Sequence, residues 1–83
     1  MAFGAALLAA NADYNGGCAI AHCQGSGTGW CDGTGPQKYQ IGVKCGNNVW
    51  YWSAGAKAFG DRTGLSAYCP SGYASLNHGW RRY

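Results

Sequence analysis

The stretch KYQIGVKCGNNVWYWS, residues 38–53, decides the fold because two segments typical of strands flank a run of Gly and Asn. Alternation divides the first segment between two faces of a strand: Tyr39, Ile41, Val43 and Cys45 on one, and Gln40, Gly42 and Lys44 on the other. The intervening Gly46-Asn47-Asn48 favours a tight turn with positive φ. The stretch therefore predicts a β-hairpin.

The length of the hairpin loop decides which face each aromatic residue joins. A two-residue loop places Trp50 and Trp52 on the apolar face and leaves Tyr51 on the other face beside Lys44. A three-residue loop reverses this arrangement, so that Tyr51 and Val49 are buried and both tryptophans are exposed. The chain is poor in Leu, Ile and Phe, and a buried indole removes about 200 Å² from water. We therefore expect the two-residue loop and buried tryptophans.

The rest of the chain predicts an all-β fold, a small antiparallel sheet of four to five strands. LSAYC, residues 65–69, alternates and places Leu65, Ala67 and Cys69 on one face. Residues 55–64 are expected to connect two strands. The segments YASL and WRRY flank Asn77-His78-Gly79, which predicts a second hairpin. Residues 13–37 are rich in Gly and contain three cysteines, so we expect a loop region held by disulfides.

Five cysteines in 83 residues indicate a disulfide framework. Cys45 and Cys69 each end an alternating strand on its apolar face and are expected to pair, closing a loop that stabilises the fold by about 3.5 kcal/mol in the chain-entropy model. Among the remaining three we favour Cys18 with Cys31, because the residues between them are rich in Gly. Cys23 is then the free thiol, although Cys23 with Cys31 is a close alternative.

The first twelve residues, MAFGAALLAANA, resemble the end of a secretory signal. An apolar run over residues 2–10 leads into Ala10-Asn11-Ala12, a small-x-small cleavage pattern. The run is shorter than the roughly 20 residues that span a bilayer, so no transmembrane segment is expected. We expect cleavage before Asp13, a mature domain of residues 13–83 and a secreted protein. The alternative is a short Ala/Leu helix packed on the domain.

No pattern in the chain predicts a catalytic or metal site. Cys18, His22, Cys23 and Cys31 lack the C-x2-C spacing that shapes a zinc knuckle, so neither a metal nor another cofactor is expected. The three acidic residues all lie in Gly-rich segments and form no evident pair for hydrolysis. The net charge of +3 is spread along the chain, which argues against nucleic-acid binding.

The chain has an apolar start, then the motifs CAIAHC, YQIGVKC and SAYCPSG, and then a Gly- and aromatic-rich ending. In this layout it resembles small secreted cysteine-containing actinobacterial proteins of unassigned function. The resemblance covers about the last 60 residues of the chain. It implies export and a β fold, and it assigns no site residues.

These features predict a secreted, non-enzymatic module that binds an anionic cell surface or another protein, with an antimicrobial peptide-like toxin as a specific version. The candidate ligand contacts are Lys44, Tyr51, Arg81 and Arg82. One alternative is a structural envelope component, joined through the odd cysteine into a dimer instead of a monomer. The other is a small thiol-dependent enzyme in which Cys23 acts with His22 or His78.

Overall fold

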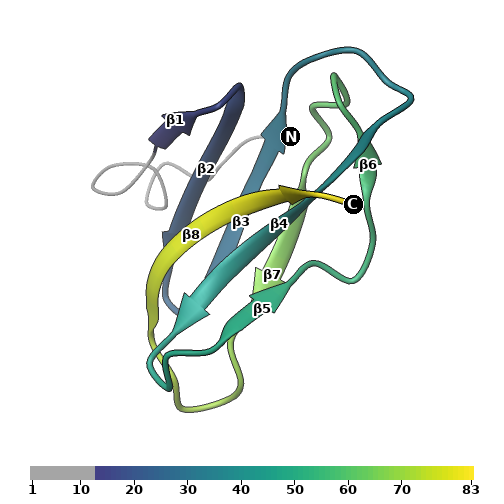
Figure 1. The fold of residues 1–83 in the computed structure, drawn as a ribbon. Helices are drawn as coiled ribbons and strands as arrows, with labels where there is room; N and C mark the ends of the chain where they lie inside the picture. Colours follow the sequence, from purple (N-terminus) through teal and green to yellow (C-terminus); the bar gives the residue numbers. More distant parts are fainter. Residues whose placement is uncertain (1–12) are drawn as a thin grey trace.

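A computed structural model describes residues 13–83 as two packed antiparallel sheets of four strands each, with no helix in that range (Figure 1). Sheet A contains, in spatial order, β1 (Asp13–Asn15), β2 (Cys18–Cys23), β3 (Ser26–Cys31) and β7 (Leu65–Tyr68). Sheet B is built on β4 (Lys38–Cys45), which pairs with β5 (Trp50–Trp52), β6 (Lys57–Ala58) and β8 (Ser75–Arg82). The all-β class is confirmed. The expected secretory signal lies outside the described residues.

The hydrophobic core lies between the two sheets. The buried side chains of its two clusters alternate along β2 and β4, as strands packed on one face require. They comprise Cys18, Ile20 and Cys31 from sheet A, and Tyr39, Ile41, Val43 and Cys45 from sheet B, with Ala67 of β7 beside them. Strand β8 crosses β2 and β3 in Figure 1, so that it covers one side of this core.

Two disulfides hold this core. Cys18 and Cys31 are paired neighbours on β2 and β3, and their bond links two strands of sheet A. Cys45 at the end of β4 is bonded to Cys69 just after β7, with their Cα atoms 5.7 Å apart, and this bond joins the two sheets. Both pairs are those that the strand alternation and the Gly-rich spacing favour. Cys23 is the free cysteine of the described residues.

The hairpin between β4 and β5 has a three-residue loop, and the expected two-residue register is wrong. Val43 pairs with Tyr51, and the Cys45 amide donates to the Val49 carbonyl at 3.0 Å. Asn48 adopts φ +64° and supplies the left-handed residue that closes such a loop. Tyr51 therefore faces the core, and both tryptophans lie on the outer face of sheet B. Val49, which a three-residue loop was also expected to bury, is 46% exposed.

Two further expectations about the chain differ from the structure. Residues 13–31, expected to be loops, form β1, β2 and β3. The strands are held by backbone hydrogen bonds between neighbours, which the glycines of β3 can also make. Asn77-His78-Gly79, expected to be a turn, lies within the continuous strand β8, which pairs with β4 along most of its length. The strand count is therefore eight in two sheets instead of four to five in one.

Truncating Tyr51 is expected to destabilise the protein more than truncating Trp50. The Tyr51 ring packs on the core cluster of Val43, Cys45 and Ala67, whereas Trp50 is 37% exposed. We expect Tyr51→Ala to lower the free energy of unfolding by about 3 kcal/mol and Trp50→Ala by about 1 kcal/mol, as measured by urea denaturation. The reverse order would contradict the observed register.

Candidate functional site: an aromatic and cationic face

The outer surface of sheet B gathers the tryptophans of β5 and two cations. Pairing across the sheet places Trp52 beside Gly42 and Trp50 beside Lys44, while on the other edge of β4 Gly79 pairs with Gly42 and Arg81 with Gln40. Side chains at these positions share the face that points away from the core. We call the set Trp50, Trp52, Gly42, Gly79, Lys44 and Arg81 the aromatic–cationic face.

The paired glycines make room for the two indoles. A Cβ atom on Gly42 would lie 2.5 Å from two carbons of the Trp52 ring, and one on Gly79 would lie 3.4 Å from the Trp50 ring. A larger residue at position 42 would displace the Trp52 ring, whereas an added Cβ at position 79 would just touch the Trp50 ring. They are stacked on each other with centroids 5.7 Å apart and an interplanar angle of 18°. Glycine in two adjacent strands thus allows the stacked pair to lie against the sheet.

Arg81 extends this stack by one more planar group. Its guanidinium carbon lies 4.2 Å from the centroid of the Trp52 ring, which is a cation–π contact. The Arg81 Nε donates to Gln40 Oε1 at 2.9 Å, and the Gln40 Nε2 donates to the Ser53 carbonyl at 3.0 Å. Gln40 is only 7% exposed, so it is a rigid support. The order Arg81, Trp52, Trp50 is therefore fixed in advance of any ligand.

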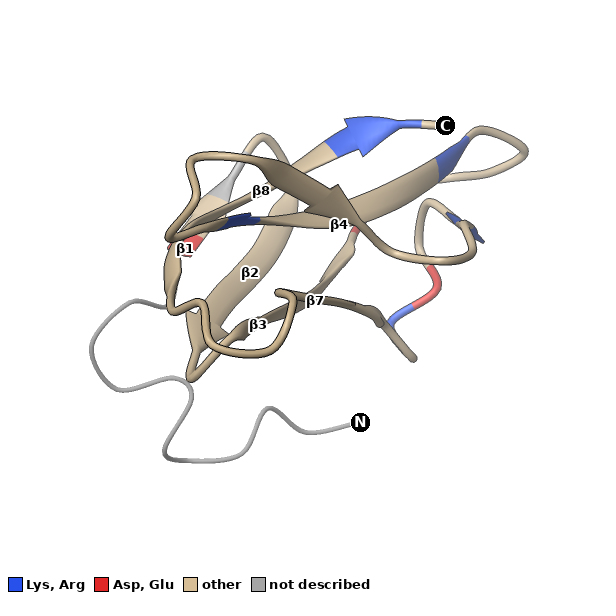
Figure 2. Ribbon diagram, turned by 90° about the horizontal axis from the view of Figure 1, so that it is seen from below, with Lys and Arg blue, Asp and Glu red and all other residues tan. Residues whose placement is uncertain are grey.

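The three acidic side chains of the chain make contacts outside this face. The Asp32 carboxylate accepts two hydrogen bonds from Arg62, which are the main reason that its pKa is lowered. Asp61 accepts hydrogen bonds from the Thr63 hydroxyl and amide, which lower the pKa of its carboxyl group. Asp13, at the start of β1, has its Oδ2 atom 3.5 Å from Nε2 of His78. Figure 2 shows blue segments on β4 and at the end of β8.

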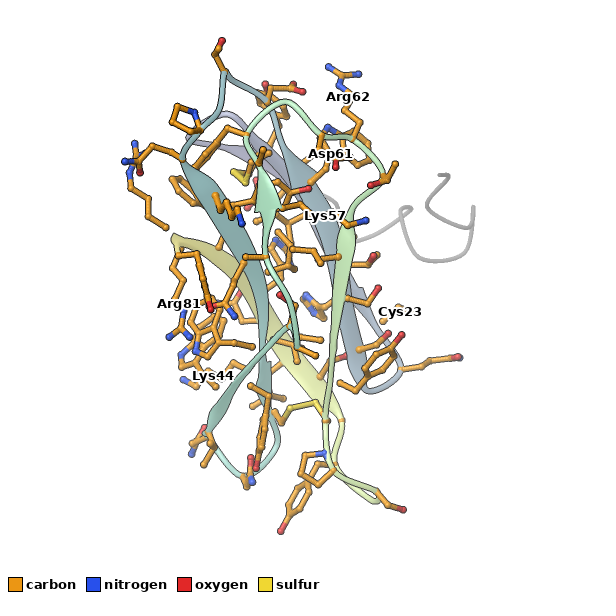
Figure 3. The ribbon with its side chains drawn as sticks, turned by 90° about the vertical axis from the view of Figure 1, so that its right-hand side faces the viewer. Cys23, Lys44, Lys57, Asp61, Arg62 and Arg81 are labelled. Atoms are coloured by element: carbon orange, nitrogen blue, oxygen red, sulfur yellow. A yellow bond between two sulfur atoms is a disulfide. The ribbon has the colours of Figure 1, made fainter. Side chains whose placement is uncertain are left out.

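The structure brings together two of the four ligand contacts that the sequence predicts. Lys44 and Arg81 lie on the same side of the molecule in Figure 3, opposite Cys23. Tyr51 lies on the inner face, where its hydroxyl accepts a hydrogen bond from Asn47 at 2.8 Å. Arg82 is directed to the other side of β8 and lies over the Phe59 ring at 5.2 Å.

Arg82 borders a pocket of about 260 Å³ at one end of the sandwich. Phe59 and Trp80 form its apolar wall in an edge-to-face contact, and Asp32 lies at its rim. Because the Asp32 carboxylate is already engaged by Arg62 and by the Tyr14 hydroxyl, its charge is largely neutralised there. The pocket thus combines an aromatic wall with polar groups and one cation, and it is separate from the aromatic–cationic face.

A pair of imidazoles links the two sheets on the other side of β8. His22 Nδ1 and His78 Nδ1 are 2.7 Å apart, with ring centroids 4.9 Å apart. Asp13 approaches the opposite nitrogen of His78, so no three metal ligands converge here, and no such group occurs elsewhere within residues 13–83. The side chain of Cys23 alternates to the other face of sheet A from His22. The strand therefore directs this thiol and this imidazole away from each other.

Comparison with known proteins identifies no relative: no family model, no curated sequence and no solved structure matches the chain. A search of the described residues for a helix of sufficient length and apolarity to cross a membrane also found none.

Gly42→Ala is expected to displace Trp52 from the sheet, because the new methyl group would overlap the ring. We expect a loss of about 2 kcal/mol in the free energy of unfolding and a red shift of tryptophan fluorescence. Gly55→Ala is the matched control, since an added Cβ there meets no atom within 4 Å. Equal stability of the two variants would contradict the close packing described here.

Proposed function

We propose that the protein is a secreted, non-enzymatic binding module that attaches to phosphate- or carboxylate-bearing polymers of a cell surface. The observation that carries this proposal is the fixed row of Arg81, Trp52 and Trp50, with Lys44 beside Trp50. Planar rings offer stacking area, and cations beside them attract anionic groups. The proposal makes the aromatic–cationic face the ligand-contact surface.

The support by Gln40 favours binding because it orders Arg81 before the ligand arrives. An arginine side chain that is already ordered loses less conformational entropy on binding than a free one. The hydrogen bond to Gln40 uses only the Nε atom, so the terminal guanidinium nitrogens keep donors for a phosphate or carboxylate. This arrangement supports recognition of anions by Arg81.

The packing of the indoles favours a polymer laid across the face over insertion into a bilayer. Both rings contact each other, and each packs against a glycine, so neither protrudes as an anchor. The net charge of +3 steers the molecule to anionic surfaces, which also supports an antimicrobial version of the function. The two disulfides support export, because such bonds persist in oxidising compartments.

The purified protein is expected to cosediment with cell-wall preparations at low salt, and the dissociation constant should rise about tenfold between 50 and 500 mM salt. Vesicles containing anionic lipid form the second arm, and stronger binding to them than to cell wall would assign the anionic groups to lipid headgroups. No binding in either arm at low salt would overturn the proposal.

Lys44→Gln and Lys57→Gln form a matched pair because both remove one positive charge. Lys44 lies on the aromatic–cationic face, whereas Lys57 is in β6 and donates to Thr63 at 2.6 Å (Figure 3). We expect Lys44→Gln to weaken binding about fivefold, or roughly 1 kcal/mol, and Lys57→Gln to change it less than about twofold. Equal losses would indicate that only net charge matters, and would exclude this face as the contact surface.

A second candidate function rests on Cys23, the partly exposed free thiol of the described residues. On the outer side of sheet A, it is placed to join the protein to another chain as a structural envelope component. A dimer band on a non-reducing gel that disappears in Cys23→Ser would support this function. A monomer with a fully titratable thiol would exclude it.

A further inference from the structure

The His22–His78 hydrogen bond connects the two sheets. His22 pairs with Gly27 on β3, and His78 pairs with Val43 on β4. A Cβ atom on Gly27 would lie only 3.0 Å from the Val43 Cβ, so glycine is what lets the sheets come together here. The close approach brings the two imidazoles to 2.7 Å between their Nδ1 atoms.

This pair can hold one added proton but not two. A hydrogen bond between two Nδ1 atoms needs one nitrogen that donates and one that accepts. When the pair holds one added proton, the acceptor Nδ1 stays unprotonated and the bond persists. A second proton places two N–H groups and two positive charges against each other at this distance. Double protonation must therefore break the link.

Asp13 offers only partial compensation for a second charge at His78. Asp13 of β1 faces His78 with its Oδ2 atom 3.5 Å from Nε2, but the Asp13 side chain is 58% exposed, so solvent screens its charge. The neighbouring positions on β3 and β4 are the uncharged Gly27 and Val43. The His78 side chain is only 9% exposed, so solvent screens a charge on it weakly.

Strand β8 connects the imidazole pair to the aromatic–cationic face. His78 points inward from this strand. Gly79 and Arg81 lie on its outer face, where Gly79 contacts the Trp50 ring and Arg81 lies over the Trp52 ring. Strand β8 follows Cys69, so neither disulfide encloses it. Its position depends on pairing with β4 and on its contacts with sheet A.

We propose that His22 and His78 form a proton switch, in which a second proton separates β8 from β2 and lowers the affinity of the aromatic–cationic face for its anionic ligand. The effect on affinity rests on the proposed function, whereas the movement of β8 does not. Added positive charge alone would strengthen binding to an anion. The switch therefore predicts a change of the opposite sign.

The titration of His22 has the direction that such a switch needs. Burial, and secondly the charge of His78, lower the pKa of His22 below its ordinary value of 6.5. The unfolded chain therefore binds this proton at a higher pH than the folded protein does. The stability contributed by the neutral form is fully present above pH 6.5 and is lost as the pH falls toward the lowered pKa.

The first experiment measures amide hydrogen exchange in the full-length protein at pH 7.5 and 5.0, with rates corrected for intrinsic exchange. We expect the protection factors of β8 amides to fall at least about tenfold at pH 5.0 while those of β3 and β7 stay within about twofold. NMR titration of the His22 imidazole should place its protonation at the same pH as the loss of β8 protection. Unchanged β8 protection through the protonation of His22 would overturn the switch.

His22→Gln is the matched variant, because a glutamine amide can donate to neutral His78 or accept from its protonated form. It should abolish the selective loss of β8 protection at pH 5.0. If this variant fails to fold, the imidazole titration of the unmodified protein decides the question. Persistence of the loss in a folded variant would overturn the assignment to His22.

Binding to a cell-wall preparation at constant ionic strength then tests the coupling to function. We expect affinity to fall about fivefold from pH 7.5 to 5.0, in proportion to the loss of β8 protection. Salt-sensitive binding that strengthens or stays constant on acidification would overturn the coupling and leave the proposed function standing. Absence of binding at both pH values, with β8 protection still lost at pH 5.0, would overturn the proposed function and uphold the movement of β8.

Discussion

The pairing of β4 along both of its edges is the constraint on which the rest of the structure depends. One edge holds β8, and the other holds β5 and β6. Because side chains alternate along this strand, its inner residues supply much of the core and its outer residues support the candidate site. Core and site are therefore built on the same eight residues, and a shift of register would disturb both.

The candidate site is an unusual use of glycine in a sheet. Glycine usually weakens a strand because it loses more backbone entropy and contributes no side chain to packing. Here Gly42 and Gly79 lie opposite each other, and the indoles fill the space that their missing side chains leave. The aromatic packing offsets part of the cost of the glycines, and it also places the rings where a ligand can reach their exposed parts.

Alternation along strands made much of the fold predictable. It identified the inner residues of β4, the all-β class and the bond between Cys45 and Cys69. The hairpin register could not be derived in this way, because it depends on whether Asn48 takes a left-handed conformation, and local composition permits either loop. Strands β1 to β3 were missed, and β8 was divided into a hairpin, because Gly and Asn, which are typical of turns, are here stabilised by pairing with other strands.

The candidate site was only partly predictable for the same reason. Lys44 and Arg81 were identified as exposed cations, but the register error placed Trp50 and Trp52 in the core and Tyr51 on the surface. Gly42 and Gly79, which pair across β4 and β8, lie more than 30 positions apart in the sequence, and no local pattern encodes their pairing. Likewise, the contact of His22 with His78 exists only because the sheets pack face to face.

The position of the disulfides also gives the molecule a mechanical asymmetry. Both bonds lie within residues 18–69, whereas β8 is attached to that cross-linked body by noncovalent contacts and by the chain that follows Cys69. Tension applied at the C-terminus would be borne first by the hydrogen bonds between β8 and β4, which open one after another from the end that is pulled. Strand β8 would separate from β4 before either disulfide was stretched. The cross-linked body would stay folded, so that β8 could pair with β4 again when the tension was released.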